Sequence, residues 1–195
     1  MSRLTRDDFL QRTQDLLCQQ GAMNVSLASV LKACGANKGS LYHFFPNGKD
    51  ELLIAAMQKQ SDFALTSNRV ILDSSDSTGE AVARLVKSLA TMVEHESCPK
   101  VLPFSAAGAS SDEASDTLRS LCGKTIETLQ RLYAAKLRED GLPTAIARSL
   151  ASVIVSTVEG SLLQSRLRGS ATPLKNANIH LQDLIRLHAT QDESD

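Results

Sequence analysis

The 195-residue sequence is poor in aromatic residues and in turn formers. Aromatic side chains make up 4% of the chain, tryptophan is absent, and there are only ten glycines and five prolines. Sheets favour aromatic and β-branched residues, and their many turns need glycine and proline, so the composition argues against an all-β fold. Leucine- and alanine-rich segments with helical periodicity, and the lack of any alternating strand pattern, predict an all-α protein.

Long apolar runs and paired cysteines are also missing. No uninterrupted run of about 18 apolar residues occurs and the N-terminus lacks the apolar core of a secretory signal, so we expect no membrane span and a cytoplasmic protein. Cys18, Cys34, Cys98 and Cys122 lie far apart without a CxxC pair. We expect reduced thiols packed as small hydrophobic side chains. His95 and Cys98 alone are too few ligands for a structural metal, so we expect neither metal nor cofactor.

An excess of one charge is missing as well, because the formal net charge is −1. The charges are nevertheless unevenly distributed. Residues 1–60 carry seven Lys/Arg and five Asp/Glu, which gives +2, and residues 61–195 carry fourteen and seventeen, which gives −3. A basic N-terminal third favours contact with a polyanion through that part of the chain.

Capping residues mark the first two helices. Thr5 and Asp8 have the spacing of a capping box in front of a helix that Gly21 ends. Ser26 can cap a second, short helix, and Gly35 is well placed to terminate it. The sequence therefore predicts two helices joined by a short connection within the first 35 residues.

A third short helix is expected over residues 37–44, because Pro46 cannot continue it. Two short helices joined by a tight glycine-containing turn form a helix-turn-helix, whose second helix enters the DNA major groove. Gly39 inside this helix and Lys49 at the start of the next are locally unfavourable, since glycine weakens helices and a cation opposes the helix dipole. A DNA backbone close to both residues would explain them, because helix N-terminal N–H groups and an ammonium bind phosphate together.

Amphipathic segments fill the rest of the chain. After a fourth long helix and a polar linker at residues 72–80, apolar stripes predict helices around 82–93, 118–137, 144–168 and 173–188, while residues 96–113 break the pattern. The helix at 144–168 is apolar on more than one face, which suggests a partner. Its apolar residues include Ile146, Leu150, Val153, Ile154, Val155, Val158, Leu162 and Leu163.

The stretch SLASVLKACGANKGSLYHFFPNGKDELL, residues 26–53, resembles the N-terminal domain of the TetR family of bacterial transcriptional regulators. Members typically show a Thr/Ser-led helix, then AGVSKGTLYHHF, then Lys or Gly-Lys before Glu-Leu. The resemblance is dense over residues 5–60, and the FPNGKDEL ending is most similar to the LmrA/YxaF-like branch, which includes regulators of multidrug-efflux genes. Ala36 and Asn37 stand where Val and Ser are common, and Asn37 could read an adenine edge bidentately.

This resemblance implies a regulator and not an enzyme. It implies a helix-turn-helix DNA-binding domain at residues 1–50 and a ligand-binding and dimerisation domain at residues 51–195. The expected protein is a homodimer that pairs through the helices near 144–168 and 173–188. Most members are repressors, which leave a palindromic operator when a small hydrophobic inducer binds the helical body.

Helix geometry and the resemblance together assign nine residues to DNA. The residues expected at phosphates and sugars are Ser26, Leu27, Tyr42, His43 and Lys49. The residues expected at base edges are Asn37, Lys38, Gly39 and Ser40. Leu41 and Phe45 are expected to face the interior.

The inducer pocket is expected in the body between residues 80 and 168, near the proline-broken segment. Its candidate lining residues, each of which could equally be ordinary core, are Met92, His95, Phe104, Cys122, Ile126, Tyr133 and Glu159. Two alternatives stay open: a thiol-based redox regulator that senses through Cys98 or Cys122, and a helical enzyme with a reactive cysteine.

Overall fold

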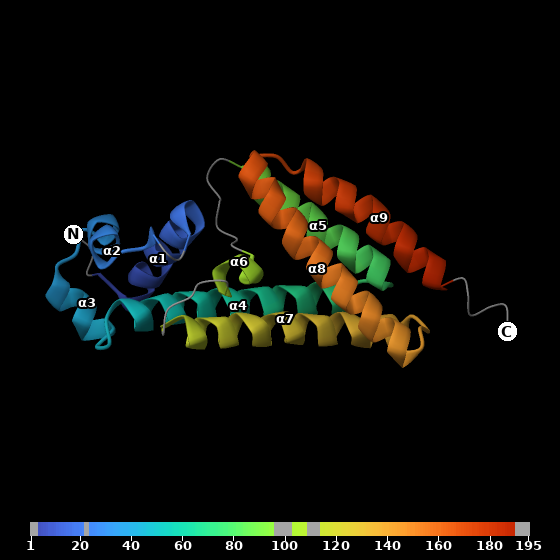
Figure 1. Ribbon diagram of the computed structural model, residues 1–195, viewed down its shortest axis with the longest axis horizontal. Coiled ribbons are helices and arrows are strands. Elements are labelled where there is room, and N and C mark those ends of the chain that lie inside the picture. The colour runs from blue at the N-terminus through green and yellow to red at the C-terminus, as the bar shows by residue number, and fades with distance from the viewer. Residues whose placement is uncertain (1–3, 22–23, 96–102, 109–113, 190–195) are drawn as a thin grey trace. The chain divides into compact units, whose positions relative to one another are not determined.

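The computed structural model describes residues 4–21, 24–95, 103–108 and 114–189, and these residues form helices with no strand among them (Figure 1). The all-α prediction is therefore confirmed. The helices are α1 (Arg6–Gln20), α2 (Leu27–Cys34), α3 (Lys38–Phe44), α4 (Lys49–Asp73), α5 (Thr78–Glu94), α6 (Phe104–Gly108), α7 (Ala114–Glu139), α8 (Thr144–Arg168) and α9 (Thr172–Ala189).

The chain divides into two compact units. The first comprises Met1–Phe63 and Pro99–Gly123, and the second comprises Ala64–Cys98 and Lys124–Asp195. The long helices α4 and α7 each contribute residues to both units. The functional boundary expected at residue 50 is a separate matter and stays a prediction.

Local capping explains where the first two helices begin and end. The Thr5 hydroxyl accepts the Asp8 N–H at 3.2 Å, and the Asp8 carboxylate accepts the Thr5 N–H at 2.8 Å. The hydrogen bonds from Thr5 lower the pKa of Asp8. Ser26 and Ser29 form the same reciprocal pair at the start of α2, and Gly35 ends α2 with a left-handed φ of 60°. An N-cap of this kind contributes about 1 kcal/mol.

Aromatic packing holds the first three helices together. Phe9 of α1 lies 5.9 Å from Phe44 and 6.1 Å from Phe45, measured between ring centroids. Leu41 and Phe45 are fully buried, which confirms the orientation expected for α3. Burying each such side chain contributes roughly 1.5–3 kcal/mol, so this small core fixes which face of α3 remains outside.

In the second unit, α5 packs against α8 and α9, and α8 packs against α9. Two polar bonds tie distant segments of this unit. The backbone N–H of Thr78, at the start of α5, donates to the Asp140 carboxylate at 2.7 Å. The buried Tyr133 hydroxyl donates to the Asn68 side-chain oxygen at 2.8 Å, and burial raises the pKa of Tyr133.

Helix α8 has an inner and an outer apolar face. Leu150, Ile154 and Leu162 are buried on the inner face, whereas Val153 and Leu167 are 42% and 78% exposed on the outer one. By length and composition alone this 25-residue helix could cross a membrane, but 44% of its apolar window is buried in the protein. Its packing against α5 and α9 is that of a core helix in a bundle.

Two segments differ from expectation. The linker is shorter than residues 72–80, because α4 continues to Asp73 and α5 begins at Thr78. The hydroxyls of Ser74 and Ser75 donate to the carbonyls four residues earlier, at 2.6 and 2.7 Å, and satisfy the end of α4. The second difference is α6, a single turn within the segment 96–113 where we expected no helix.

Candidate nucleic-acid interface

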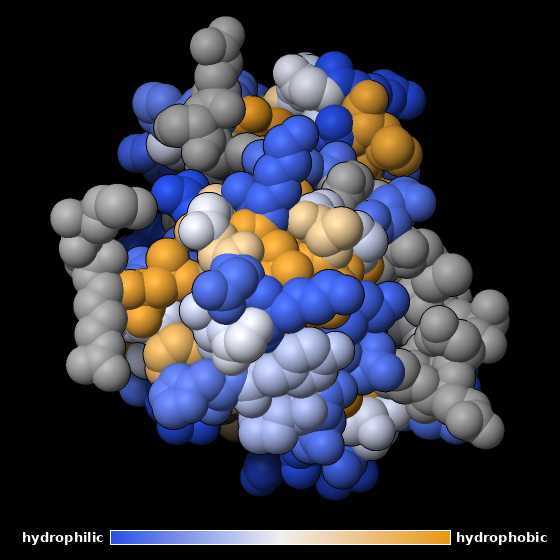
Figure 2. Space-filling view, turned by 90° about the vertical axis from the view of Figure 1, so that its left-hand side faces the viewer, coloured by the Kyte–Doolittle hydropathy of each residue, from blue (hydrophilic) through white to orange (hydrophobic). Residues whose placement is uncertain are grey.

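The four predicted base-reading residues lie on one turn. Asn37, Lys38 and Gly39 are exposed and Ser40 is half-buried, while Leu41 points into the core. Figure 2 views the side of the molecule on which α2 and α3 lie in Figure 1, and most of the surface visible there is hydrophilic. The first turn of α3 is thus available to a polar partner outside the chain.

Asn37 is the N-cap of α3. Its side-chain oxygen Oδ1 accepts the Ser40 N–H at 2.8 Å and the Ser40 hydroxyl at 3.1 Å. Bidentate reading of adenine requires this same oxygen to accept from the base while Nδ2 donates to it. Both lone pairs of Oδ1 are engaged, so we revise the adenine hypothesis for Asn37. That Asn37 contacts DNA stays a prediction, with Nδ2 as its available donor.

Gly39 has no structural need for its missing side chain within the chain. A Cβ built on Gly39 would meet only the Asn37 Oδ1, at an ordinary contact distance of 3.4 Å. Tight packing of α3 against α1 or α2 therefore does not explain the glycine. If the missing Cβ has a function, the group that approaches it belongs to another molecule.

Tyr42 lies beside the beginning of α4. A Cβ built on Gly48 would lie 3.4 Å from the Tyr42 Cε1 atom and 3.7 Å from its hydroxyl oxygen. Gly48 also has a φ of 76°, a conformation that favours glycine. Because Gly48 directly precedes Lys49, the Tyr42 ring lies beside the start of α4, where the Glu51 carboxylate accepts the Asn47 N–H at 2.9 Å.

The other predicted backbone contacts lie on two helices. Ser26 is exposed and its hydroxyl accepts the Ser29 N–H at 3.0 Å, so it is an N-cap whatever else it does. Leu27 is half-buried at the first position of α2. His43 is exposed, with its ring edge-on to Phe44 at 4.9 Å. Contact of these residues with DNA stays a prediction.

Cations in this part of the molecule are mostly unpaired, whereas acids are mostly engaged. Within residues 4–63, apart from the masked positions, only two cations have a carboxylate partner: Arg12 with Asp15 and Lys59 with Asp7. The cations without one are Arg6, Lys32, Lys38 and Lys49. Unpaired cations facing solvent produce the positive potential that attracts a phosphate backbone.

Sequence reasoning did not single out two of these cations. The guanidinium of Arg6 lies 5.0 Å from the centroid of the Phe45 ring, a cation–π contact that holds it at the surface. Lys32 is exposed in the last turn of α2. Arg6 could have been found, because it opposes the dipole at the first position of α1 just as Lys49 does in α4.

The seven pocket candidates belong to different units. Phe104 and Cys122 lie in the first unit, and the remaining five in the second. Cys122 is 2% exposed, and His95 is exposed at the end of α5. Tyr133 is buried with its hydroxyl already bonded to Asn68. A pocket lined by these residues stays a prediction.

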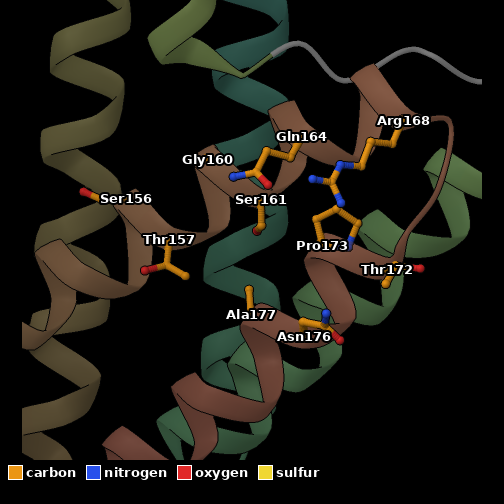
Figure 3. Close-up of a pocket in the computed structure, with 10 residues that line it drawn as sticks. All are labelled: Ser156, Thr157, Gly160, Ser161, Gln164, Arg168, Thr172, Pro173, Asn176 and Ala177. Atoms are coloured by element: carbon orange, nitrogen blue, oxygen red, sulfur yellow. The ribbon is translucent and has the colours of Figure 1, made fainter.

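A different hollow lies on the surface of the second unit. It is a groove of about 380 Å³ between α8 and α9, and it includes none of the seven candidates. Figure 3 shows Gln164 and Arg168 of α8 on one side and Pro173 and Asn176 of α9 on the other. The residues that line it are Ser156, Thr157, Gly160, Ser161, Gln164, Arg168, Thr172, Pro173, Asn176 and Ala177.

Three of the four cysteines lie in the part of the chain that the structure describes. Cys18, Cys34 and Cys122 form no disulfide, and Cys122 is covered by α6, since a Cβ built on Gly108 would lie 3.1 Å from its Cβ. Burial raises the pKa of Cys34. No three His, Cys, Asp or Glu side chains gather there as metal ligands, and Cys98 lies outside the described residues.

Two short capped helices, an exposed turn on the second and unpaired cations around it define a helix-turn-helix DNA-binding protein. The family pattern described as "Bacterial regulatory proteins, tetR family" matches residues 9–56. The pattern described as "Transcriptional regulator LmrA/YxaF-like, C-terminal domain" matches residues 78–180. The chain therefore belongs to the TetR family of transcriptional regulators, in its LmrA/YxaF-like branch, which confirms the resemblance.

Relatives span nearly the whole chain. It is 31% identical to the HTH-type transcriptional regulator YxaF of Bacillus subtilis, covering 87% of this chain and 89% of that one. It is 26% identical to LmrA of the same organism, covering 93% and 97%. It is 25% identical to the HTH-type transcriptional repressor NemR of Escherichia coli, covering 93% and 94%.

A solved structure shares the fold. The regulator CifR, solved as a cysteine mutant with 26-bp operator DNA, superposes with a TM-score of 0.78 at 21% identity, covering 95% of this chain and 98% of that one. The chain therefore has the TetR-family fold, and its family patterns and relatives make it a DNA-binding transcriptional regulator.

Proposed function

We propose that the protein is a repressor that binds a palindromic operator as a homodimer and leaves it when a small hydrophobic molecule enters its helical body. The observation that carries the DNA part is the exposed first turn of α3 beside cations without carboxylate partners. Repression is supported by the relative NemR, which is named a repressor. Such a protein works in the cytoplasm, where its operator is.

In this proposal the contacts to DNA divide by type. Tyr42, Lys49 and the N–H groups at the start of α4 hold one phosphate, and Ser26 and Leu27 hold another at the start of α2. Arg6, Lys32 and His43 add contacts to the backbone. The first turn of α3, residues 37–40, meets base edges in the major groove.

The homodimer is proposed to form through α8 and α9. The outer face of α8 carries residues at alternating spacings of three and four, the repeat of a helix that packs along another helix. The groove between α8 and α9 borders this face and shares Ser156 and Gly160 with it. The members of this outer stripe are Ile146, Ser149, Val153, Ser156, Gly160, Leu163 and Leu167.

The ligand is proposed to bind among the five pocket candidates of the second unit, Met92, His95, Ile126, Tyr133 and Glu159, which combine apolar side chains with a few polar groups. It acts by favouring a spacing of the two DNA-binding heads that no longer matches successive major grooves. A hundredfold loss of operator affinity requires the ligand to prefer the non-binding state by about 2.7 kcal/mol.

A displacement experiment tests the ligand. A fluorescent operator duplex bound to the protein is exposed to a panel of dyes, antibiotics and aldehydes, with and without reductant. We expect at least one hydrophobic compound to release the DNA regardless of reductant. If only oxidants act, and Cys98→Ser abolishes their effect, the thiol-based alternative replaces the ligand. If the protein binds no duplex specifically and a cysteine reacts unusually fast with maleimide, the enzyme alternative gains.

A further inference from the structure

We propose that Asn37 and Lys38 read the major-groove edge of a guanine, and that the bond from Ser40 to Asn37 makes adenine a poor partner at that position. The inference rests on the proposed role of α3 as the recognition helix. It replaces the adenine hypothesis with one that the hydrogen-bond arrangement of the turn supports.

The orientation of the Asn37 amide follows from its partner. A backbone N–H can only donate, so the atom that faces the Ser40 N–H at 2.8 Å must be the oxygen. The Ser40 hydroxyl donates to the same oxygen at 3.1 Å. An amide oxygen has two lone pairs, and both are used. The amide therefore offers a base its two Nδ2 donors and no acceptor.

The neighbouring residues offer donors as well. The exposed Lys38 ammonium carries three N–H donors, no acceptor, and no carboxylate partner in the described part of the chain. Gly39 has no side chain to contribute. The Ser40 hydroxyl has spent its proton on Asn37 and is half-buried. The exposed polar groups of this turn, Asn37 and Lys38, are thus hydrogen-bond donors only.

The donors of Asn37 and Lys38 distinguish the four bases. In the major groove guanine presents two acceptors, O6 and N7, whereas adenine presents the N7 acceptor beside the N6 donor. Thymine presents one acceptor beside a methyl group, and cytosine presents a donor. Guanine therefore satisfies Nδ2 of Asn37 and the Lys38 ammonium together, and cytosine satisfies neither.

Reading adenine would destabilise the start of α3 in the complex. Turning the Asn37 oxygen toward the adenine N6 group breaks the N-cap of α3. Losing an N-cap lowers the equilibrium constant for helix formation by roughly two- to thirtyfold. Part of the gain from an adenine contact, roughly five- to hundredfold in discrimination, would be lost again. Guanine can be read with the cap intact.

The test uses matched substitutions at one residue. Asn37→Ser and Asn37→Asp keep a capping oxygen, because Ser and Asp cap about as well as Asn, but neither has the amide donors. Asn37→Ala removes cap and donors together. Each protein is titrated by fluorescence anisotropy against its selected operator, with all four base pairs placed in turn at each half-site position, and thermal unfolding is measured in parallel.

We expect one position at which the parent prefers guanine over cytosine by roughly five- to hundredfold. Asn37→Ser should reduce the preference at that position alone to the part that Lys38 contributes, with an unchanged melting temperature. Asn37→Asp should shift it toward cytosine, whose N4 group can donate to the added carboxylate. Asn37→Ala should lower the melting temperature as well.

A preference for adenine that depends on Asn37 would overturn the inference, and so would an unchanged base profile in Asn37→Ser. These outcomes leave DNA binding intact and overturn only the base assignment. A parent protein that binds its selected operator no more tightly than a random duplex would instead overturn α3 as a recognition helix, and the inference with it.

Discussion

Asn37 and Gly39 are two exposed residues of the same turn that contribute differently to the fold. Asn37 holds the start of α3 through two hydrogen bonds from Ser40. Gly39 does nothing comparable, because a Cβ at its position would meet no atom other than the Asn37 Oδ1 within 4 Å. A glycine in a helix lowers stability by about 1 kcal/mol relative to alanine. No contact within the described chain compensates for this loss of helix stability.

Gly39→Ala is therefore expected to separate stability from function. The free energy of unfolding should rise by up to about 1 kcal/mol, measured by urea denaturation. Operator affinity should fall by about tenfold, on the order of one lost charge-assisted hydrogen bond, because the added methyl group separates the helix from DNA. Gly123→Ala, at a position in α7 where an added Cβ meets nothing within 4 Å, is the control and should leave affinity unchanged. Equal operator affinity in Gly39→Ala and the parent would count against DNA contact at this turn.

How well the sequence predicts the role of a site residue depends on how far along the chain its contact partner lies. The exposure of Asn37, Lys38 and Gly39 follows from helix periodicity and is confirmed by the structure. The capping bond that restricts Asn37 spans only three residues, so the sequence pattern could predict it, although we expect only base reading from Asn37 on the sequence alone. The pairing of Lys59 with Asp7, 52 residues away, could not be read from spacing. Which cations remain unpaired is therefore a property of the folded chain.

At the scale of helices, local caps determined what could be predicted. The bounds of α2, α3 and α8 agree with the expected ones. For α2 and α3 the reason is that Ser26, Gly35 and Pro46 act on the adjacent backbone. The predicted second apolar face of α8 is present as a row of exposed residues including Ile146 and Val153. The single turn α6 could not be predicted, because it packs closely on α7 at Gly108 and has no capping or periodic pattern of its own.

Gly160→Leu is expected to block dimer formation through α8. Gly160 is exposed in the middle of the outer stripe, and a Cβ there meets nothing within 4 Å in the single chain, so the fold should tolerate the change. Small residues let helix backbones approach closely, and a leucine at that point would keep two copies apart.

Light scattering measures this directly. The parent should have twice the 21.0-kDa chain mass at micromolar concentration, and Gly160→Leu should approach the single mass with unchanged helicity by circular dichroism. Gly123→Leu is the matched control and should remain a dimer. A monomeric parent, or a Gly160→Leu variant that stays dimeric, would contradict pairing through this face of α8.

At the scale of the whole molecule, charge and family membership point the same way. The family patterns cover residues 9–56, which form the first helices, and residues 78–180, which form most of the remaining helices. The net charge of −1 conceals a set of unpaired cations in the first 50 residues. The sequence alone predicted this asymmetry but not the identity of the ligand, because the pocket candidates come from distant segments whose packing no local pattern specifies.

Sequence-specific DNA binding by the helix-turn-helix domain, residues 1–50, is tested most directly by selection from a random duplex pool. The parent should enrich a palindrome whose half-sites are centred about 34–36 Å apart or a multiple of that distance. The double variant Tyr42→Phe/Lys49→Ala should bind every duplex more weakly, with a salt slope smaller by about one per protomer, whereas Lys87→Ala, the same charge change on α5, should match the parent. A pool without an enriched palindrome, or a double variant that binds like the parent, would contradict the account.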